Sequence, residues 1–366
     1  MRAPTLSAWR AADGERPATF ASRGAAILGN ALRSTALRSN AFCITAAFML
    51  ILHGCKSANT LSPVSETRLL LDTVCTITIY EPQDRRILTE ALDQCEMYEN
   101  LLSVTKEDSD VWRVNHAGGV PVTVSPFTAE VIKAGLEFGE LSSGRFDITI
   151  GRLSALWDFK GDPSVPSGKE LAAAVSTVDY RKVEVTGDVV RLADPDTRLD
   201  PGGIAKGYIA DRLAGFIREC GVKSAVIDLG GNVIVVGTKP DKTLWRVGVR
   251  KPFGRNGELL GTITTGESSV VTSGIYERLF ESDGVMYHHI LDPDSGMPAE
   301  SDVFSATVLS ESSMTGDALS TMLVLAGSER AAELIDGAPG VTGALLLLAD
   351  GAVLEFGDVV FDRAGS

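Results

Sequence analysis

The chain has 366 residues, of which 44% are hydrophobic and 22% charged, and its formal net charge at pH 7 is −14. These proportions are typical of a globular protein with one large or two ordinary domains. The acidic balance and an aromatic content of only 6% argue against binding to nucleic acid. A ligand that carries phosphate must therefore be held by local features or by a metal ion.

The first 55 residues have the character of an export segment that precedes the folded domain. Residues 1–40 are rich in Arg, Ala and Ser without periodicity, which indicates disorder or an upstream extension. The apolar run Ala41–Leu52 has the length of a secretory signal and is too short for a comfortable membrane span. It leads into His53-Gly54-Cys55, which resembles a bacterial lipobox, except that His53 replaces the usual small or apolar residue.

This pattern predicts that residues 1–55 are an extension with a lipoprotein-type signal, and that Cys55 is lipidated. Residues 56–66 are polar and are expected to form a tether. A lipid on Cys55 would hold the protein on the outer, periplasmic or extracellular, face of a bacterial inner membrane. An ordinary signal peptide cut nearby and an uncleaved anchor are the alternatives. The folded domain is expected over residues 67–366.

The first part of this domain is predicted to mix strands and helices. Leu69–Tyr80 alternates and is rich in Thr, Val and Ile, which predicts one strand. Apolar residues at helical spacing predict helices over Asp84–Leu102 and Thr128–Ser142. Gly144–Ile150 is expected to form a turn that leads into an extended piece.

The second part is predicted to contain more strands than helices. A hairpin is expected across Thr186-Gly187-Asp188, and a helix is expected to run to about Cys220. Ser224–Val236 has the pattern of a strand broken by a Gly-Gly turn, several short strands follow, and Asp317–Ala326 is expected to be helical. Because strands and helices come in runs, the pattern favours an α+β fold with mainly antiparallel sheets and packed helices.

The segment Asp200-Pro-Gly-Gly-Ile-Ala-Lys-Gly-Tyr-Ile-Ala-Asp211 joins a strand-like piece to a helix. Its paired glycines allow a ligand to approach the backbone closely, and the start of the helix offers free N–H groups to an anion. Lys206 adds a positive charge suited to phosphate. The segment is not a P-loop, because Lys206 is followed by Gly207 and not by Ser or Thr. A plain strand–turn–helix with a solvated lysine is the alternative.

Further polar clusters stand at the ends of apolar segments. Asp317 and Thr321 are spaced i and i+4, so they share one helix face and form a hard-oxygen pair suited to Mg²⁺ or Ca²⁺. A helix start with a solvated aspartate is the simpler alternative. His289 precedes an Ile-Leu-Asp-Pro turn, where it can be a base, a phosphate partner or a turn residue.

Several motifs occur in an order and at separations that resemble one known family. They are Leu71-Asp72-Thr73, Asp108-Ser109 with Asn115, Gly144-Arg-Phe-Asp147, the Asp200–Asp211 segment, Asp228-Leu-Gly-Gly-Asn232, Thr272-Ser-Gly274, His289-Ile-Leu-Asp292-Pro and Asp317–Thr321. Together they resemble the ApbE-type FAD:protein FMN transferases, the flavin-trafficking lipoproteins. The chain departs from the family pattern at Leu71-Asp72, where Met-Gly is common, and at Thr105, where an aromatic residue is common.

The resemblance implies a T-fold-like α+β architecture with FAD bound as substrate between the two halves of the chain. It implies Mg²⁺ as cofactor, held by Asp317, Thr321 and the backbone carbonyl of Gly203. The flavin contacts that it implies are Leu71, Thr105, Arg145, Phe146, Asp147, Asp200, Lys206, His289 and Leu291. The implied catalytic residues are His289, Lys206 and Asp317, with either His289 or an aspartate near the metal as the base.

The implied reaction splits the FAD pyrophosphate, transfers FMN to a Thr or Ser hydroxyl of a partner protein and releases AMP. Subunits of membrane redox complexes are the implied acceptors. Two alternatives are a Mg²⁺-dependent FAD pyrophosphatase that uses water, and a non-catalytic FAD-binding lipoprotein. The Asp317 and Thr321 pair weighs against the second alternative, because flavin binding alone requires no metal.

Overall fold

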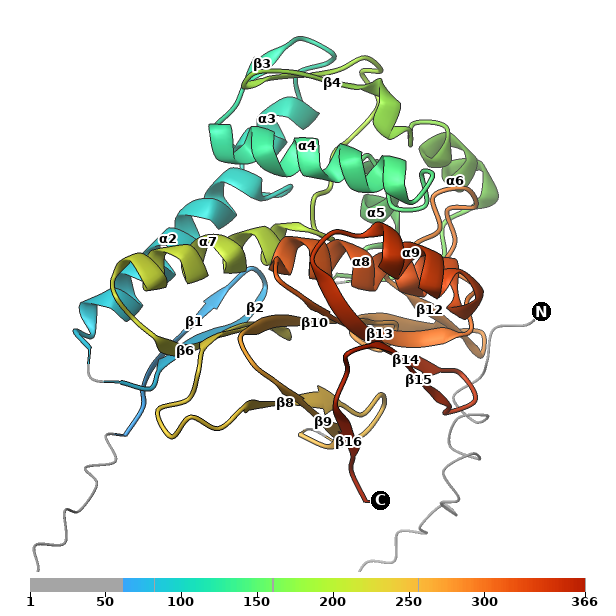
Figure 1. Ribbon diagram of the computed structural model, residues 1–366. Helices are drawn as coiled ribbons and strands as arrows, with labels where there is room; N and C mark the ends of the chain where they lie inside the picture. Colours follow the sequence, from blue (N-terminus) through green and yellow to red (C-terminus); the bar gives the residue numbers. More distant parts are fainter. Residues whose placement is uncertain (1–61, 82, 160, 256, 366) are drawn as a thin grey trace, which may run out of the picture.

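The computed structural model describes residues 62–365 apart from Pro82, Lys160 and Asn256. The expected signal segment, its Cys55 and most of the expected tether lie outside these residues. A layered α+β structure is built around an antiparallel sheet of eight strands, in the order β1-β2-β6-β7-β10-β13-β14-β15 (Figure 1). The fold class expected from the sequence is thereby confirmed.

The central sheet is assembled from strands far apart in the sequence. Its strands are β1 (Val64–Leu70), β2 (Thr73–Ile79), β6 (Ser224–Leu229), β7 (Asn232–Gly237), β10 (Ser268–Gly274), β13 (Val303–Ser310), β14 (Val341–Leu348) and β15 (Val353–Gly357). Every residue of β13 is buried, because both faces of the sheet are covered there. β1 begins inside the segment expected to be a tether.

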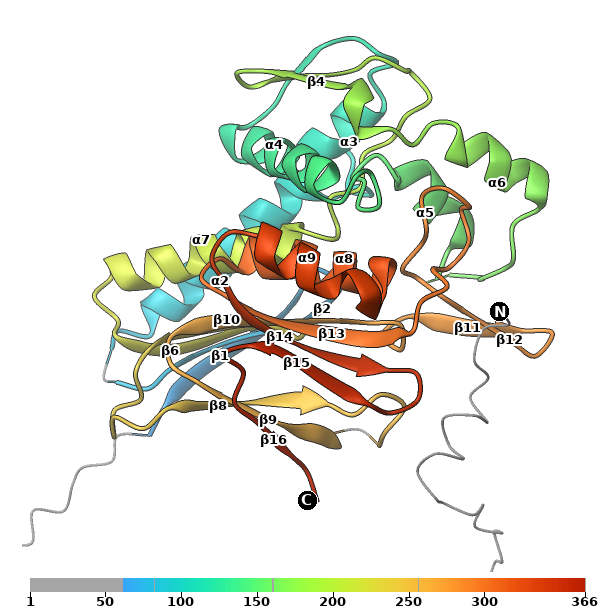
Figure 2. The ribbon, with the colours of Figure 1, turned by 45° about the vertical axis from the view of Figure 1, so that its right-hand side comes forward.

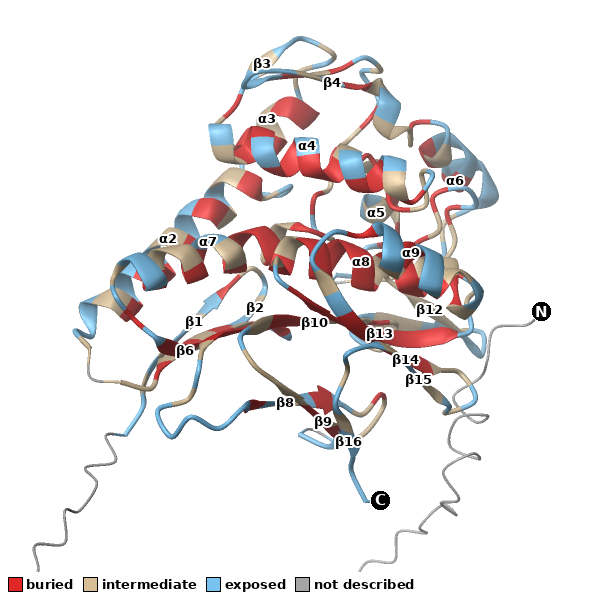
Figure 3. Ribbon diagram, viewed as in Figure 1, coloured by how far each residue is buried: buried red, intermediate tan, exposed pale blue. Residues whose placement is uncertain are grey.

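Helices cover one face of the sheet, as two views agree (Figures 1 and 2). They are α2 (Arg86–Leu102), α7 (Ala205–Glu219), α8 (Ser313–Ala326) and α9 (Ala331–Gly337), with the 3-10 turn Ser328–Arg330 between the last two. α8 packs on β10 and β13 and lies beside α7. Residues coloured as buried concentrate where these helices meet the sheet (Figure 3).

A smaller sheet of β8 (Trp245–Arg250), β9 (Leu259–Thr265) and β16 (Phe361–Arg363) covers part of the opposite face. Its apolar side chains Val249, Leu260 and Ile263 form a second core with residues of β10, β13 and β14. The central sheet is therefore buried between a helical layer and a β layer, as Figure 1 shows.

The segment between α2 and α7 forms a further layer above the helices in Figure 1. It contains α3 (Asp110–Asn115), α4 (Pro126–Leu141), α5 (Gly151–Trp157), α6 (Gly168–Val175), the 3-10 turn Tyr180–Lys182, and a sheet of β3 (Val122–Thr123), β5 (Val189–Leu192) and β4 (Val183–Thr186). The hairpin of β11 (Leu279–Ser282) and β12 (Val285–His288) extends beyond the central sheet (Figure 2).

The expected single strand over Leu69–Tyr80 is wrong. The chain reverses at Leu71 and Asp72, which both have left-handed backbones with φ of 56° and 57°, and continues as β2. The alternation of side chains continues through both strands, so it hides the turn, and no glycine marks the reversal. The extended piece expected after Gly144 also forms no strand.

The helix expected to begin at Asp317 begins four residues earlier, at Ser313, where Ser312 caps it by accepting from the Thr315 N–H. Asp317 therefore lies inside α8 and is not a solvated residue at a helix start. Its side chain is only 4% exposed. Because it is buried, the Asp317 carboxylate acts on groups packed against it within the protein.

Candidate active site

The turn before α7 is held in place from two sides. The Asn115 side chain donates from Nδ2 to the Leu199 carbonyl at 2.9 Å and accepts from the Leu199 N–H at 2.6 Å. The Asp200 N–H donates to the Ile148 carbonyl at 2.7 Å. The Asp200 carboxylate accepts from the Gly202 N–H at 3.0 Å. The Asp200 turn is thus tied to Ile148, the residue that follows the Arg145–Asp147 turn.

Gly203 and Phe146 bring these two turns into contact. A Cβ on Gly203 would lie 2.8 Å from a ring carbon of Phe146, which is closer than real Cβ atoms approach, so only glycine fits without a shift. The Phe146 ring is 6% exposed and also packs edge-on against Phe138. Phe146 therefore shapes the backbone at Gly203.

Asp147 serves an internal purpose in this structure. Its carboxylate accepts from the Thr149 N–H at 2.8 Å, the Thr149 hydroxyl at 2.6 Å and the Tyr180 N–H at 2.8 Å. Burial raises the pKa of the Asp147 carboxyl, and these donors oppose the shift. Asp147 thus positions the turn, whereas the resemblance implied a flavin contact.

Asp317 of α8 caps the start of α7. Its Oδ2 accepts from the Gly207 N–H at 2.9 Å. In a continuous helix that N–H would donate to the Gly203 carbonyl, four residues earlier. Among the described residues, the Gly203 carbonyl consequently receives no backbone hydrogen bond. Its oxygen is left available to a ligand.

The two helices cap each other. Asp211 of α7 accepts from the Ser312 hydroxyl and from the Ser313 and Met314 N–H groups, at 2.7, 2.7 and 3.0 Å. These are the first N–H groups of α8. The aspartates at 211 and 317 therefore lock the relative position of α7 and α8, which helix packing alone would leave adjustable.

Lys206 lies among three titratable groups. It is half-buried in the first turn of α7, and its ammonium makes no hydrogen bond or ion pair with the residues that the structure describes. Burial raises the pKa of the Asp317 and Glu277 carboxyls, and in both the nearby Lys206 charge opposes the shift. The same charge helps to lower the pKa of His289. Lys206 is therefore available to a ligand anion.

His289 is held neutral by its surroundings. Burial lowers its pKa to about 3, and the Arg278 charge adds to this effect. Its Nδ1 lies 3.3 Å from the Arg278 carbonyl. A carbonyl can only accept, so Nδ1 carries the hydrogen and Nε2 keeps a lone pair. His289 can therefore accept a proton at Nε2.

Thr321 lies one turn after Asp317 on α8, as its spacing predicted. Its hydroxyl is 3.1 Å from the Ser273 hydroxyl and 3.4 Å from the Asp317 carbonyl. The oxygens of Asp317, Thr321 and Gly203 are of the hard type that Mg²⁺ prefers. The described residues contain no cluster of three or more His, Cys, Asp or Glu that could hold a metal. A cation here would thus rely on hydroxyl and carbonyl oxygens as well.

The remaining implied contacts are less closely joined to this centre. Leu71 is half-buried at the β1–β2 turn, and Arg145 is half-buried beside Phe146. Thr105 is exposed after α2, where its N–H and hydroxyl both lie 3.2 Å from the Ser103 hydroxyl. Leu291 is 5% exposed and packs in an apolar cluster with Leu153 and Trp157, so its side chain acts in packing.

Sequence reasoning missed three contributors. They are Glu277, Ser273 and Asp211, of which Ser273 and Asp211 belong to motifs that gave them no role. The partners that give them roles lie far away in the chain, as with Asp211 and Ser313, 102 residues apart. For Asp211 the local signal was a charged residue inside a helical pattern.

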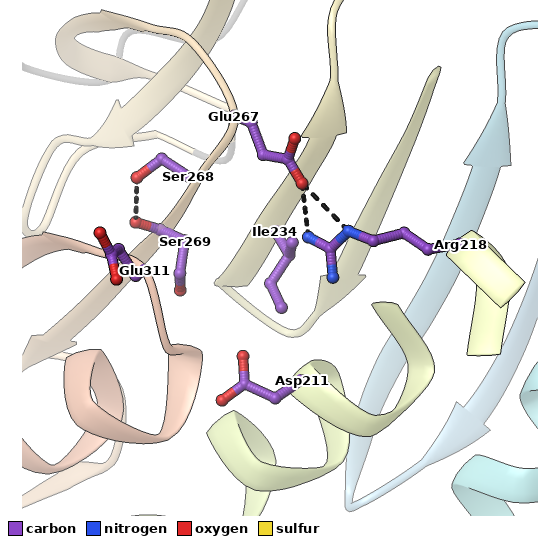
Figure 4. Close-up of a pocket in the computed structure, with 7 residues that line it drawn as sticks. All are labelled: Asp211, Arg218, Ile234, Glu267, Ser268, Ser269 and Glu311. Atoms are coloured by element: carbon purple, nitrogen blue, oxygen red, sulfur yellow. Dashed lines mark hydrogen bonds and ion pairs between the residues drawn. The ribbon is translucent and has the colours of Figure 1, made fainter. Parts of the chain in front are cut away.

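A recess of about 230 Å³ lies farther along α7 (Figure 4). It is lined by Asp211, Arg218, Ile234, Glu267, Ser268, Ser269 and Glu311, and the Arg218–Glu267 ion pair spans it. None of the residues implied to bind flavin lines it. We therefore place the candidate site at the start of α7.

The fold and site together define an α+β protein in which a half-buried lysine at a helix start lies beside a buried carboxylate. The chain belongs to the ApbE family, whose model matches residues 71–346. It is similar to an FAD:protein FMN transferase of Treponema pallidum (strain Nichols), with 33% identity over 81% of this chain and 87% of the relative. A protein of the same name from Klebsiella pneumoniae (strain 342) is 39% identical over 68% of this chain and 78% of its own length.

Two solved structures share the fold. The ApbE protein of Thermotoga maritima has a TM-score of 0.73 and 32% identity, covering 81% of this chain and 97% of that one. The flavin transferase ApbE from Vibrio cholerae has a TM-score of 0.72 and 28% identity, covering 81% and 96%. Family membership and fold are thus established by both sequence and structure.

Proposed function

We propose that this protein is a Mg²⁺-dependent FAD:protein FMN transferase that modifies a Thr or Ser hydroxyl of a partner protein. The observation that carries this proposal is the meeting of Lys206 and Asp317 at the start of α7, in a chain whose relatives bear this name. An unpaired ammonium beside a helix start suits a pyrophosphate, and a buried carboxylate beside free oxygens suits a cation.

The reaction exchanges one phosphate ester for another. The acceptor oxygen forms a bond to the FMN phosphorus of FAD, the bridging P–O bond breaks toward AMP, and the hydroxyl proton leaves. Such a transfer depends mainly on positioning and on neutralising charge. Lys206 supplies fixed positive charge where negative charge develops on the phosphates.

His289 is suited to take the acceptor proton because it is neutral and presents Nε2 as an acceptor. The negative charge of a bound pyrophosphate would raise its low pKa toward the working range. Asp317, Thr321 and the Gly203 carbonyl would hold Mg²⁺. When bound there, the ion would polarise the phosphate oxygens and lower the charge opposing attack.

We propose further that the domain is carried on the outer face of a bacterial inner membrane by a lipid on Cys55, with subunits of membrane redox complexes as acceptors. The lipobox-like end of the signal motivates the anchor. Within residues 62–365, no helix is long and apolar enough to cross a membrane. Attachment through a lipid is compatible with that finding.

The test is incubation with FAD, Mg²⁺ and a Thr-bearing acceptor, followed by intact-mass measurement of the acceptor and assay of AMP. A transferase adds one FMN group to the acceptor for each AMP released. Release of FMN and AMP with the acceptor unmodified would instead identify a pyrophosphatase. FAD that binds but stays intact would overturn the enzymatic proposal altogether.

A further inference from the structure

A second recess, of about 260 Å³, adjoins the end of β8 and has a different character. Its lining residues are Arg250, Lys251, Phe253, Gly254, Arg255 and Tyr276. We call it the basic recess. Three of these residues are cations within six consecutive positions, in a chain whose net charge is −14. Such a concentration of one sign on an acidic protein favours binding of an anion.

Two of the three cations are available to a partner. Lys251 is paired with Glu258 at 3.2 Å, and the Glu258 carboxylate also accepts from the Arg255 N–H at 3.0 Å. The guanidinium groups of Arg250 and Arg255 make no hydrogen bond or ion pair with the described residues. Both residues are exposed. Guanidinium is the group best shaped to bind a carboxylate with two parallel hydrogen bonds.

The wall of the recess is ordered by aromatic packing. The Phe253 backbone is left-handed, with φ of 55°, which costs a bulky residue about 1–2 kcal/mol. Its ring centroid is 6.2 Å from that of Tyr276 and 6.3 Å from that of Phe304, edge-on in both cases. Such pairs contribute about 0.5–1.5 kcal/mol each. The rings therefore hold the turn that presents Arg250 and Arg255.

A short backbone segment connects the wall of the basic recess to the candidate active site. Ser273 contacts Thr321 at 3.1 Å, and a Cβ on the next residue, Gly274, would lie 2.8 Å from Cζ of the Tyr276 ring. Three residues of backbone thus lead from an implied metal ligand to the wall of the recess. Glu277 follows Tyr276 in the chain. Burial raises the pKa of its carboxyl, and the positive charges of Lys206 and Arg250 both oppose that shift.

The basic recess is smaller than a pocket expected for FAD. Pockets for ligands of ordinary drug size have about 300–1,000 Å³, and FAD is larger than such ligands. A recess of about 260 Å³ has the size to accept one side chain together with a short stretch of peptide backbone. The acceptor protein must bring its hydroxyl to the FMN phosphorus, so part of that protein has to lie at the rim of the site.

We propose that the basic recess binds an acidic segment of the acceptor protein, close to the Thr or Ser that receives FMN. This inference rests on the proposed function. The acidic body of the enzyme would repel such a segment elsewhere, so Arg250 and Arg255 both attract and orient it. The recess would thereby select acceptors by charge, separately from the chemistry at Lys206.

The first experiment measures binding without chemistry. A fluorescent peptide with Asp residues around one Ala is titrated into the FAD-loaded protein, and its anisotropy gives Kd. Arg250→Glu and Arg255→Glu are each expected to weaken binding about tenfold, which corresponds to about 1.4 kcal/mol. Lys223→Glu is the matched control, because this substitution changes the net charge by the same amount. Lys223 is exposed just after the C-terminal end of α7, away from the lining of the basic recess.

The second experiment measures transfer to a Thr peptide with Asp flanks and to its Asp→Asn twin. The wild type should show a lower KM for the acidic peptide, and both Arg variants should lose that preference with kcat and FAD affinity unchanged. Equal Kd values in the Arg variants and the wild type would overturn the inference. So would displacement of the acidic peptide by equimolar inorganic phosphate, which would mark a small-anion site.

The two proposals fail differently. If the acidic peptide binds through Arg250 and Arg255 but FAD is never cleaved, the proposed transferase activity is wrong and the basic recess stands. If FMN is transferred to both peptides with the same KM in every variant, the transferase activity stands. The inference about acceptor selection is then wrong.

Discussion

The Asp317 carboxylate accepts a hydrogen bond from the Gly207 N–H, with 2.9 Å between Oδ2 and N. These residues are 110 positions apart in the chain. The contact diverts an N–H from the helix, leaves the Gly203 carbonyl without it, and places a buried carboxylate beside Lys206. This one hydrogen bond thereby fixes the position of the Asp317 carboxylate and leaves the Gly203 carbonyl oxygen open to a ligand.

The first prediction concerns Gly207, where α7 packs closely against the start of α8. A Cβ at this position would lie 2.7 Å from the Met314 Cα, so Gly207→Ala should push α7 and α8 apart and cost about 1–3 kcal/mol. Gly215→Ala on the same helix meets nothing within 4 Å and should stabilise the protein by up to about 1 kcal/mol. Denaturant unfolding of both variants measures the contrast. Equal effects would show that α7 has room at Gly207.

Asp317 is predicted to matter through its charge. Asp317→Asn keeps an acceptor oxygen for the Gly207 N–H but should lower turnover on the order of 10²-fold or more, while the fold survives. Mg²⁺ should raise the Tm of the wild type and not that of the variant. The control is Asp336→Asn, the same chemical change at an exposed position of α9. Full wild-type activity in excess chelator would rule out the metal role.

Lys206 is predicted to act mainly in the transition state. Lys206→Ala should lower kcat on the order of 10²-fold and raise KM for FAD less, because the acidic body of the protein supplies no general positive field in its place. Lys206→Arg should rescue poorly, since a planar fork does not occupy the place of a compact ammonium. Steady-state FAD turnover at saturating Mg²⁺ measures both, with Lys223→Ala as control. Unchanged kcat and KM in both variants would make Lys206 a solvated helix residue.

His288 is predicted to destabilise the protein in acid. Burial lowers its pKa to about 4, and its Nδ1 has no partner among the described residues. The unfolded chain takes up this proton near pH 6.5, so the stability contribution is present above that pH and is lost as pH falls toward 4. At pH 5 the loss is about 2 kcal/mol.

The matched variant for this effect is His288→Gln, which cannot titrate. Buried carboxyls with raised pKa, such as Asp147 and Asp211, act in the opposite direction but are present in both proteins. The difference between the two stability curves therefore isolates His288. Denaturant unfolding at pH 7.5 and pH 5 should show the larger loss in the wild type. Parallel losses would contradict the assignment.

Cys55 is predicted to anchor the protein. Cys55→Ser should leave the protein unprocessed or release it from the membrane, because the serine hydroxyl cannot replace the thiol in the lipidation reaction. Fractionation and electrophoretic mobility of the wild type and the variant, expressed with the full signal, measure this. Membrane retention with unchanged mobility would exclude the lipid anchor.

The amino-acid sequence was sufficient for the features that depend on neighbouring residues. The period of α2 and the i, i+4 spacing of Asp317 and Thr321 predicted helices and a shared face. The runs of strands predicted antiparallel α+β architecture, and ordered motifs such as Asp200–Asp211 predicted the family. These signals are local, so they survive without knowledge of the fold.

Only the tertiary structure decided what depends on distant partners. Leu71 and Asp72 turn the chain although alternation continues through them, because pairing between β1 and β2 sets the reversal. The neutrality of His289 follows from burial. The release of the Gly203 carbonyl follows from a hydrogen bond between α7 and α8. Burial and long-range hydrogen bonds are properties of packed surfaces, and no stretch of neighbouring residues contains them.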